Sequence, residues 1–166
     1  MSELENKKRE LLTPLLFEAG AALMDCQRFE YGIALFLFHA GRVGIGKIDP
    51  EQVEKILSDN EKKTAGQLLQ MLKANIDINS KNEAIFKEAL ACRNKLIHRV
   101  FVNKAEKIVS ETGRADLIKE IRDFRRNVNK GDDILGPLNL ELSELLDGFD
   151  FETKKNEVIK TVLNTN

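Results

Sequence analysis

The chain has 166 residues, of which 42% are apolar and 32% charged, and its formal net charge is −1. This length suits one domain with its own core, and the near-neutral charge excludes a protein drawn as a whole to nucleic acid or to a membrane surface. Two cysteines are too few for a disulfide framework, so we expect a cytoplasmic protein. The charged N-terminus lacks the apolar core of a signal peptide, and the apolar run at 33–40 is too short to cross a bilayer. We therefore expect no membrane association.

The first helix is expected to open at Thr13-Pro14, which has the form of an N-cap followed by a first helical residue. Its apolar positions continue toward Phe36, with a candidate break near Cys26, and glycines end it from Gly41 on. The segment 41–47 also matches the G-x-x-x-x-G-K pattern of a nucleotide-binding loop. The Ser or Thr that would hold magnesium is missing, so a helix end followed by a loop is the favoured interpretation.

Four further helix starts follow along the chain. Asp49-Pro50 opens a short helix, and capping-box patterns at 64–67 and 80–83 open two more. The second of these is expected to continue to Phe101, and another helix to begin at about Arg114.

Beyond residue 130 we expect a turn at Gly131-Asp132-Asp133 and a boundary at Gly136-Pro137, followed by one or two leucine-rich helices. No strand pattern persists anywhere. The predicted fold is therefore all-α, an antiparallel helical bundle over 1–130. An acidic C-terminal helical extension over 131–166 is expected to pack on the bundle or on a partner.

One stretch carries candidate chemistry: Arg93-Asn94-Lys95-Leu96-Ile97-His98. A histidine can move a proton near neutral pH, and an arginine can hold a phosphate and stabilise the charge that builds on it. These two groups suffice to cleave RNA without a metal. No cysteine or histidine with zinc-ligand spacing surrounds them, so we expect neither a metal nor a cofactor.

Helical geometry separates the two groups, because residues five apart differ by about 140° around a helix, whereas Asn94 and His98 lie nearly in line. We therefore expect that one helix alone does not focus Arg93 and His98 on one phosphate, and that two copies across a two-fold axis do. Glu30, with its neighbours Phe29 and Tyr31, is a candidate to face the same cleft. The alternative is a surface histidine, with an arginine that pairs with Glu83 or Glu88.

Positive charge is concentrated around this stretch. Residues 87–130 carry 12 Lys and Arg against 6 Asp and Glu, a balance of +6, while residues 131–166 carry 3 against 8, a balance of −5. Three basic residues close to the motif are candidates to follow an RNA backbone, with solvated helix faces as the alternative: Lys95, Arg99 and Lys104. A second cluster can bind RNA or pair with the acidic tail: Arg122, Arg125 and Arg126.

The motif and its helical context resemble the HEPN superfamily (higher eukaryotes and prokaryotes nucleotide-binding domain), in particular its small bacterial stand-alone members. The family motif is R-x-x-x-x-H with Asn or Asp after the arginine, and the resemblance covers about residues 14–128. Many members are dimeric, metal-independent endoribonucleases of toxin–antitoxin and antiviral systems. By resemblance, Arg93 contacts the scissile phosphate, His98 is the general acid or base, and Asn94 orients His98 or the phosphate.

The resemblance implies a metal-independent endoribonuclease, of toxin or defence type, with a composite Arg/His site at a homodimer interface and an antitoxin or regulatory protein as partner. One toxin group also carries a Tyr two residues after the histidine, where an antitoxin modifies it. Val100 stands there in this chain, so that form of regulation is not expected. Two alternatives are a non-catalytic module that binds RNA, a nucleotide or a protein, and a structural protein held by its leucine-rich tail.

Overall fold

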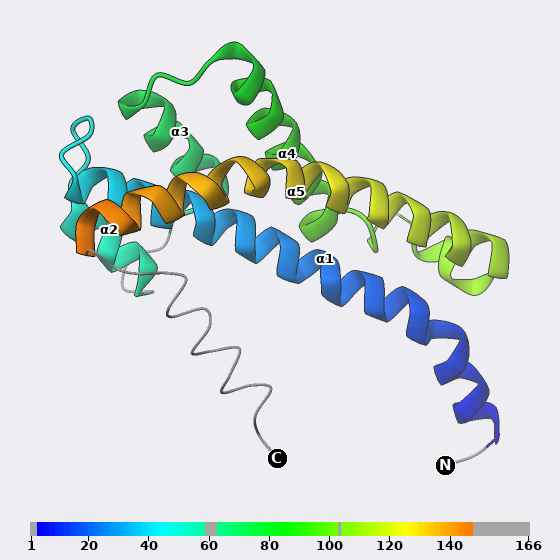
Figure 1. Ribbon diagram of the computed structural model, residues 1–166. Coiled ribbons are helices and arrows are strands. Elements are labelled where there is room, and N and C mark those ends of the chain that lie inside the picture. Colours follow the sequence, from blue (N-terminus) through cyan, green and yellow to red (C-terminus); the bar gives the residue numbers. More distant parts are fainter. Residues whose placement is uncertain (1–2, 59–62, 103, 148–166) are drawn as a thin grey trace, which may run out of the picture. The chain divides into compact units, whose positions relative to one another are not determined.

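The computed structural model describes residues 3–58, 63–102 and 104–147 (Figure 1). These residues form five α-helices and one short 3-10 helix, without a strand among them, which confirms the predicted all-α class. The elements in chain order are α1 (Glu3–Arg42), α2 (Pro50–Leu57), α3 (Ala65–Asn75), α4 (Ser80–His98), η1 (Ala105–Val109) and α5 (Glu111–Asp147). Within the described part of the chain, none of these helices combines the length and the apolar character needed to cross a membrane.

The helices form two compact units, and α1 and α5 each contribute to both. Unit 1 joins α1 up to Tyr31 with the residues from Ile78 to Asp133, and unit 2 joins the residues from Gly32 to Asp77 with α5 from Ile134 on. The motif lies in unit 1.

Unit 1 is built from α1, α4 and the first part of α5. In this unit α1 and α5 run parallel, because contacts that advance along α1 also advance along α5: Glu18 pairs with Arg122, and Arg28 with Asp132. Its core contains fully buried apolar side chains from all three helices: Cys26, Phe29, Cys92, Leu117, Ile121 and Val128.

In unit 2 the structure confirms the predicted N-caps of α2 and α3 and the predicted loop after α1. Asp49 accepts a hydrogen bond from the Glu51 amide, and Thr64 forms a reciprocal capping box with Gln67. Gly44 and Gly46 have positive φ, and the segment that resembled a nucleotide-binding loop follows a helix, not a strand.

Several predicted helix boundaries were wrong. The first helix begins at Glu3 and passes through Pro14, so Thr13-Pro14 is not its start, and the candidate break near Cys26 is absent. The Thr13 hydroxyl donates to the Arg9 carbonyl, 2.7 Å away, within the continuous helix. The N-cap of α4 is Asn79, one residue earlier than the predicted pattern, and α4 ends at His98, short of Phe101.

The predicted turn at Gly131-Asp132-Asp133 was also wrong, because α5 runs through it without interruption. A Cβ at Gly131 would lie 2.6 Å from Phe29 Cε2 and 3.0 Å from Ala89 Cβ. Gly131 is therefore a packing residue where α1, α4 and α5 approach one another closely. The predicted boundary at Gly136-Pro137 was wrong as well, because α5 also continues through these two residues. The division at residue 130 stays a prediction, and the helices predicted beyond 147 lie outside the described residues.

We expect Gly131→Ala to lower the free energy of unfolding by about 1–3 kcal/mol, because the fully buried Phe29 ring cannot move aside for the new methyl group. The loss should appear in urea titration, despite the better helix propensity of alanine. Asp133→Ala is the control, since this exposed position of the same helix should change stability by less than about 0.5 kcal/mol. A Gly131→Ala protein as stable as the parent would contradict the packing role.

Candidate functional site

The motif occupies the last turns of α4, with His98 as the final helical residue. The buried side of this helix is formed by Ala89, Cys92 and Leu96, which pack into the core of unit 1. Burial of that side leaves Asn94 and His98 exposed and Arg93 partly buried. The predicted placement of the whole motif on one helix is therefore correct.

Arg93 connects the motif to α1. Its Nε and Nη2 atoms both contact the Oε1 carboxylate oxygen of Glu30, and the two side chains are only 15% and 26% exposed. The other nitrogen, Nη1, donates to Asn94 Oδ1 at 3.1 Å and lies 3.5 Å from His98 Nε2. One guanidinium thus contacts an acidic, an amide and an imidazole side chain.

Within one chain the two groups are closer than their helical spacing predicts, so that part of the expectation was wrong, and a site shared by two copies stays a prediction. The arginine side chain is long enough to reach round the helix, and Glu30 holds the Nε edge so that Nη1 faces His98. The alternative pairing with Glu83 or Glu88 is also wrong, because the partner comes from α1; Glu88 accepts from the Cys92 thiol instead. Arg93 and Glu30 are 63 positions apart, so the sequence around either residue does not predict their contact; it shows only that the first helix carries a carboxylate there.

The three predicted RNA-binding residues have different surroundings. Lys95 Nζ lies 5.2 Å from the centre of the Phe124 ring, a cation–π distance, and Lys104 forms an ion pair with Glu120 on α5. Arg99 is exposed at the C-cap of α4, immediately after His98. Lys95 and Arg99 therefore remain near the motif, whereas the charge of Lys104 is balanced on another helix.

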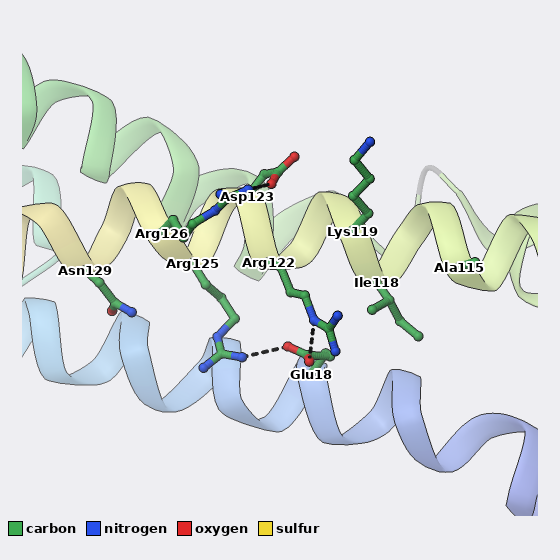
Figure 2. A pocket seen from close by; sticks show the side chains of 9 residues that line it. All are labelled: Glu18, Ala115, Ile118, Lys119, Arg122, Asp123, Arg125, Arg126 and Asn129. Atoms are coloured by element: carbon green, nitrogen blue, oxygen red, sulfur yellow. Dashed lines mark hydrogen bonds and ion pairs between the residues drawn. The ribbon is translucent and has the colours of Figure 1, made fainter.

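Two arginines of the second basic cluster, Arg122 and Arg125, pair with α1 (Figure 2). Arg122 and Arg125 both bind the Glu18 carboxylate, at 2.7 and 2.6 Å, and Arg125 also binds Asp25 at 2.7 Å. Arg126 points away from α1 and pairs with Asp123 on its own helix (Figure 2). A groove of about 600 Å³ lies beside these residues, but its charges are largely paired, which disfavours a strong anion site there.

The Glu18 carboxylate is unusually acidic for a buried group. Burial alone would raise its pKa, but hydrogen bonds and charge from Arg122 and Arg125 outweigh burial and lower the pKa below its ordinary value. Asp25 also raises the pKa of Arg125, through a hydrogen bond that burial only partly opposes. The α1–α5 contact is therefore held by ion pairs of Glu18 with Arg122 and Arg125 and of Asp25 with Arg125.

The two cysteines are not candidate nucleophiles. Burial raises the pKa of the Cys26 thiol to about 11, and burial together with a hydrogen bond to Glu88 raises that of Cys92 to about 11. Over the residues that the structure describes, no group of three or more His, Cys, Asp or Glu side chains is placed to hold a metal ion.

An apolar hollow of about 330 Å³ lies next to the motif. Its lining comes from three helices and the turn after α4, and includes Ala19, Gly20, Leu23, Leu96, Ile97 and Phe101. Ile97, which lines the hollow, directly precedes His98 in the sequence.

Comparison of the chain with protein-family models, with curated proteins and with solved structures finds no match.

We expect the free energy of unfolding to fall in acid as Glu18 is protonated. Because its folded-state pKa is lowered, the stability it provides is present above the ordinary value of 4.5 and is lost as the pH falls through the folded-state pKa. Urea titrations from neutral to acidic pH measure this loss. Glu18→Gln should remove this part of the pH dependence and lower stability at neutral pH by about 1.5–3 kcal/mol, because both arginines lose a charged acceptor.

Glu141→Gln is the matched control, since it neutralises an exposed glutamate and should leave the pH dependence as in the parent. An unchanged acid transition in Glu18→Gln would show that this carboxylate does not link pH to folding.

Proposed function

We propose that this chain is a metal-independent endoribonuclease whose reactive groups are Arg93 and His98. The observation that carries the proposal is the 3.5 Å separation of Arg93 Nη1 and His98 Nε2, on a surface where His98 is exposed. A phosphate seated beside these nitrogens would meet a fixed positive charge and a group able to transfer a proton. Asn94 Oδ1, at 3.1 Å from the same guanidinium nitrogen, would help to hold the arginine in place.

The reaction proposed is an internal transesterification of RNA. The 2′ oxygen attacks the adjacent phosphorus as its proton leaves, the bond from phosphorus to the 5′ oxygen breaks, and that oxygen takes up a proton. The products are a 2′,3′-cyclic phosphate and a 5′ hydroxyl. Arg93 would stabilise charge on the non-bridging oxygens, and His98 would carry out a proton transfer. DNA lacks the 2′ hydroxyl and would not react.

A second copy of the chain belongs to this proposal. The reaction has two proton transfers, at the 2′ and the 5′ oxygens, while each chain supplies one histidine at the motif. Two copies with their motifs in one cleft would supply a base and an acid together. The resemblance to the HEPN superfamily points the same way, and extends the proposal to a cytoplasmic toxin or defence role with an antitoxin or regulatory partner.

One observation favours a second candidate function, a non-catalytic module that binds RNA, a nucleotide or a protein. Glu30 occupies the Nε edge of Arg93, so the guanidinium is already partly neutralised. A paired arginine attracts a phosphate less strongly than a free one. In this case the surface around Arg93 and His98 would bind its ligand without cleaving it.

We expect His98→Ala to reduce RNA cleavage at least about a hundredfold in the presence of excess chelator, because the reaction loses its proton-transfer group. Since His98 is exposed at the end of α4, the variant should keep the helix content and thermal stability of the parent. The measurement is the cleavage rate of a labelled RNA, with product ends tested for the cyclic phosphate.

Arg99→Ala serves as the control, because it removes an exposed cation from the adjacent residue and should change the rate only a few-fold through weaker phosphate attraction. Equal cleavage by the parent and by His98→Ala would contradict the catalytic role of His98. A folded parent that binds RNA but leaves it intact would favour the non-catalytic module.

A further inference from the structure

The outward side of α1 in unit 1 carries no charge over more than four turns. Every exposed position from Leu11 to Gln27 has an uncharged side chain. The two charged residues within this segment, Glu18 and Asp25, are only 5% and 6% exposed and pair with α5. A surface helix normally shows the reverse arrangement, with its charges toward water and its apolar residues toward the core.

Five of the nine exposed residues in this segment are also large and apolar. Phe17 is 71% exposed and Met24 70%, seven residues apart, and Leu16 and Leu23 repeat the same spacing on the adjoining row. Rows seven residues apart lie on one side of a helix. A continuous apolar stripe of this kind, without charge, is typical of a surface that another helix covers.

Gly20 lies at the centre of the stripe, in the interior of α1, where glycine is less favourable than alanine. A Cβ added at Gly20 would meet no atom within 4 Å, so nothing among the described residues requires this glycine. A backbone that approaches from outside would require it.

The stripe is symmetric about Gly20. Its four large apolar residues stand at −4, −3, +3 and +4 from the glycine: Leu16, Phe17, Leu23 and Met24. We infer that a second copy of this chain packs on this face, with the two α1 helices crossing antiparallel at Gly20. In that arrangement residue 16 of one copy faces residue 24 of the other, and 17 faces 23. A two-fold interface requires such self-complementarity, and a different partner protein would not.

The apolar hollow beside Gly20 gives the second copy a place to insert a side chain. Gly20 and Leu23 form part of its wall, and Ile97 and Phe101 continue the wall toward the motif. Its volume of about 330 Å³ accommodates a large apolar side chain, such as Phe17 of the second copy. The inference rests on the dimer included in the proposed function and identifies α1, with the end of α4, as its surface.

The test is the mass of the full chain by sedimentation equilibrium. We expect the parent to be a dimer, and Phe17→Glu and Met24→Glu each to weaken dimerisation at least about a hundredfold, because each buries an unpaired carboxylate in the contact. Both positions are exposed in the single chain, so circular dichroism should show unchanged helix content. Val109→Glu is the matched control, because Val109 is 85% exposed and belongs to η1 and not to the α1 stripe, so this variant should remain dimeric.

Gly20→Ala separates an interface from a chance run of apolar residues. In the monomeric Phe17→Glu background it should raise the unfolding midpoint, since alanine favours the helix and its methyl group meets nothing. In the parent it should weaken dimerisation about tenfold or more, because the methyl group holds the two backbones apart. Stabilisation of the monomer without weaker dimerisation would contradict the crossing at Gly20.

A monomeric parent would overturn the inference. The occupant of the apolar face of α1 would then be residues 148–166 or a different protein. A parent dimer that survives both Glu substitutions would place the interface elsewhere. RNA cleavage is measured separately, so the two proposals can fail independently. A dimer that cleaves no RNA supports the α1 interface and counts against the nuclease. A monomer that cleaves RNA supports the nuclease activity and counts against the α1 interface and against a cleft shared by two copies.

Discussion

The arrangement of unit 1 depends on the burial of two carboxylates of α1 against Arg125 of α5. Glu18 and Asp25 lie almost out of contact with water, so each would strongly destabilise the fold without a positively charged partner. This requirement selects one rotation of α1 and one register of α5 along it. The inward side of α1 also carries Leu15, Ala22 and Cys26, and a second apolar side, with Phe17 and Met24, is left facing outward. The paired arginines of α5 and the uncharged outer face of α1 thus have the same physical origin.

The same rotation of α1 has a consequence for the motif. Glu30 follows Asp25 by five residues, and in this orientation it reaches α4 and holds the guanidinium of Arg93. That contact turns the remaining nitrogen toward His98 and creates the arrangement on which the proposed chemistry depends. Arg93 consequently has two roles, an ion pair that joins two helices and a charge beside an exposed imidazole. A change at Glu30 would affect both roles at once.

Several sequence interpretations failed for one shared reason, which is that a local signal can serve a distant contact. Gly131 was interpreted as a turn residue, but its missing side chain admits Phe29 and Ala89, which are distant in sequence. The basic residues of α5 were assigned to RNA or to the acidic tail, whereas buried carboxylates on α1 bind two of them.

The sequence by itself determined the helical class, the caps of α2 and α3, and the placement of Arg93, Asn94 and His98 on one helix. These features depend on interactions within a few residues of chain, which capping rules and helical periodicity describe. Only the tertiary structure decided that Glu30 orients Arg93, that Glu18 and Asp25 face α5, and that the apolar side of α1 is left uncovered. Each of these joins residues tens of positions apart, and side-chain packing together with the free energy of burying charge selects among the many pairings that a charged helical chain allows.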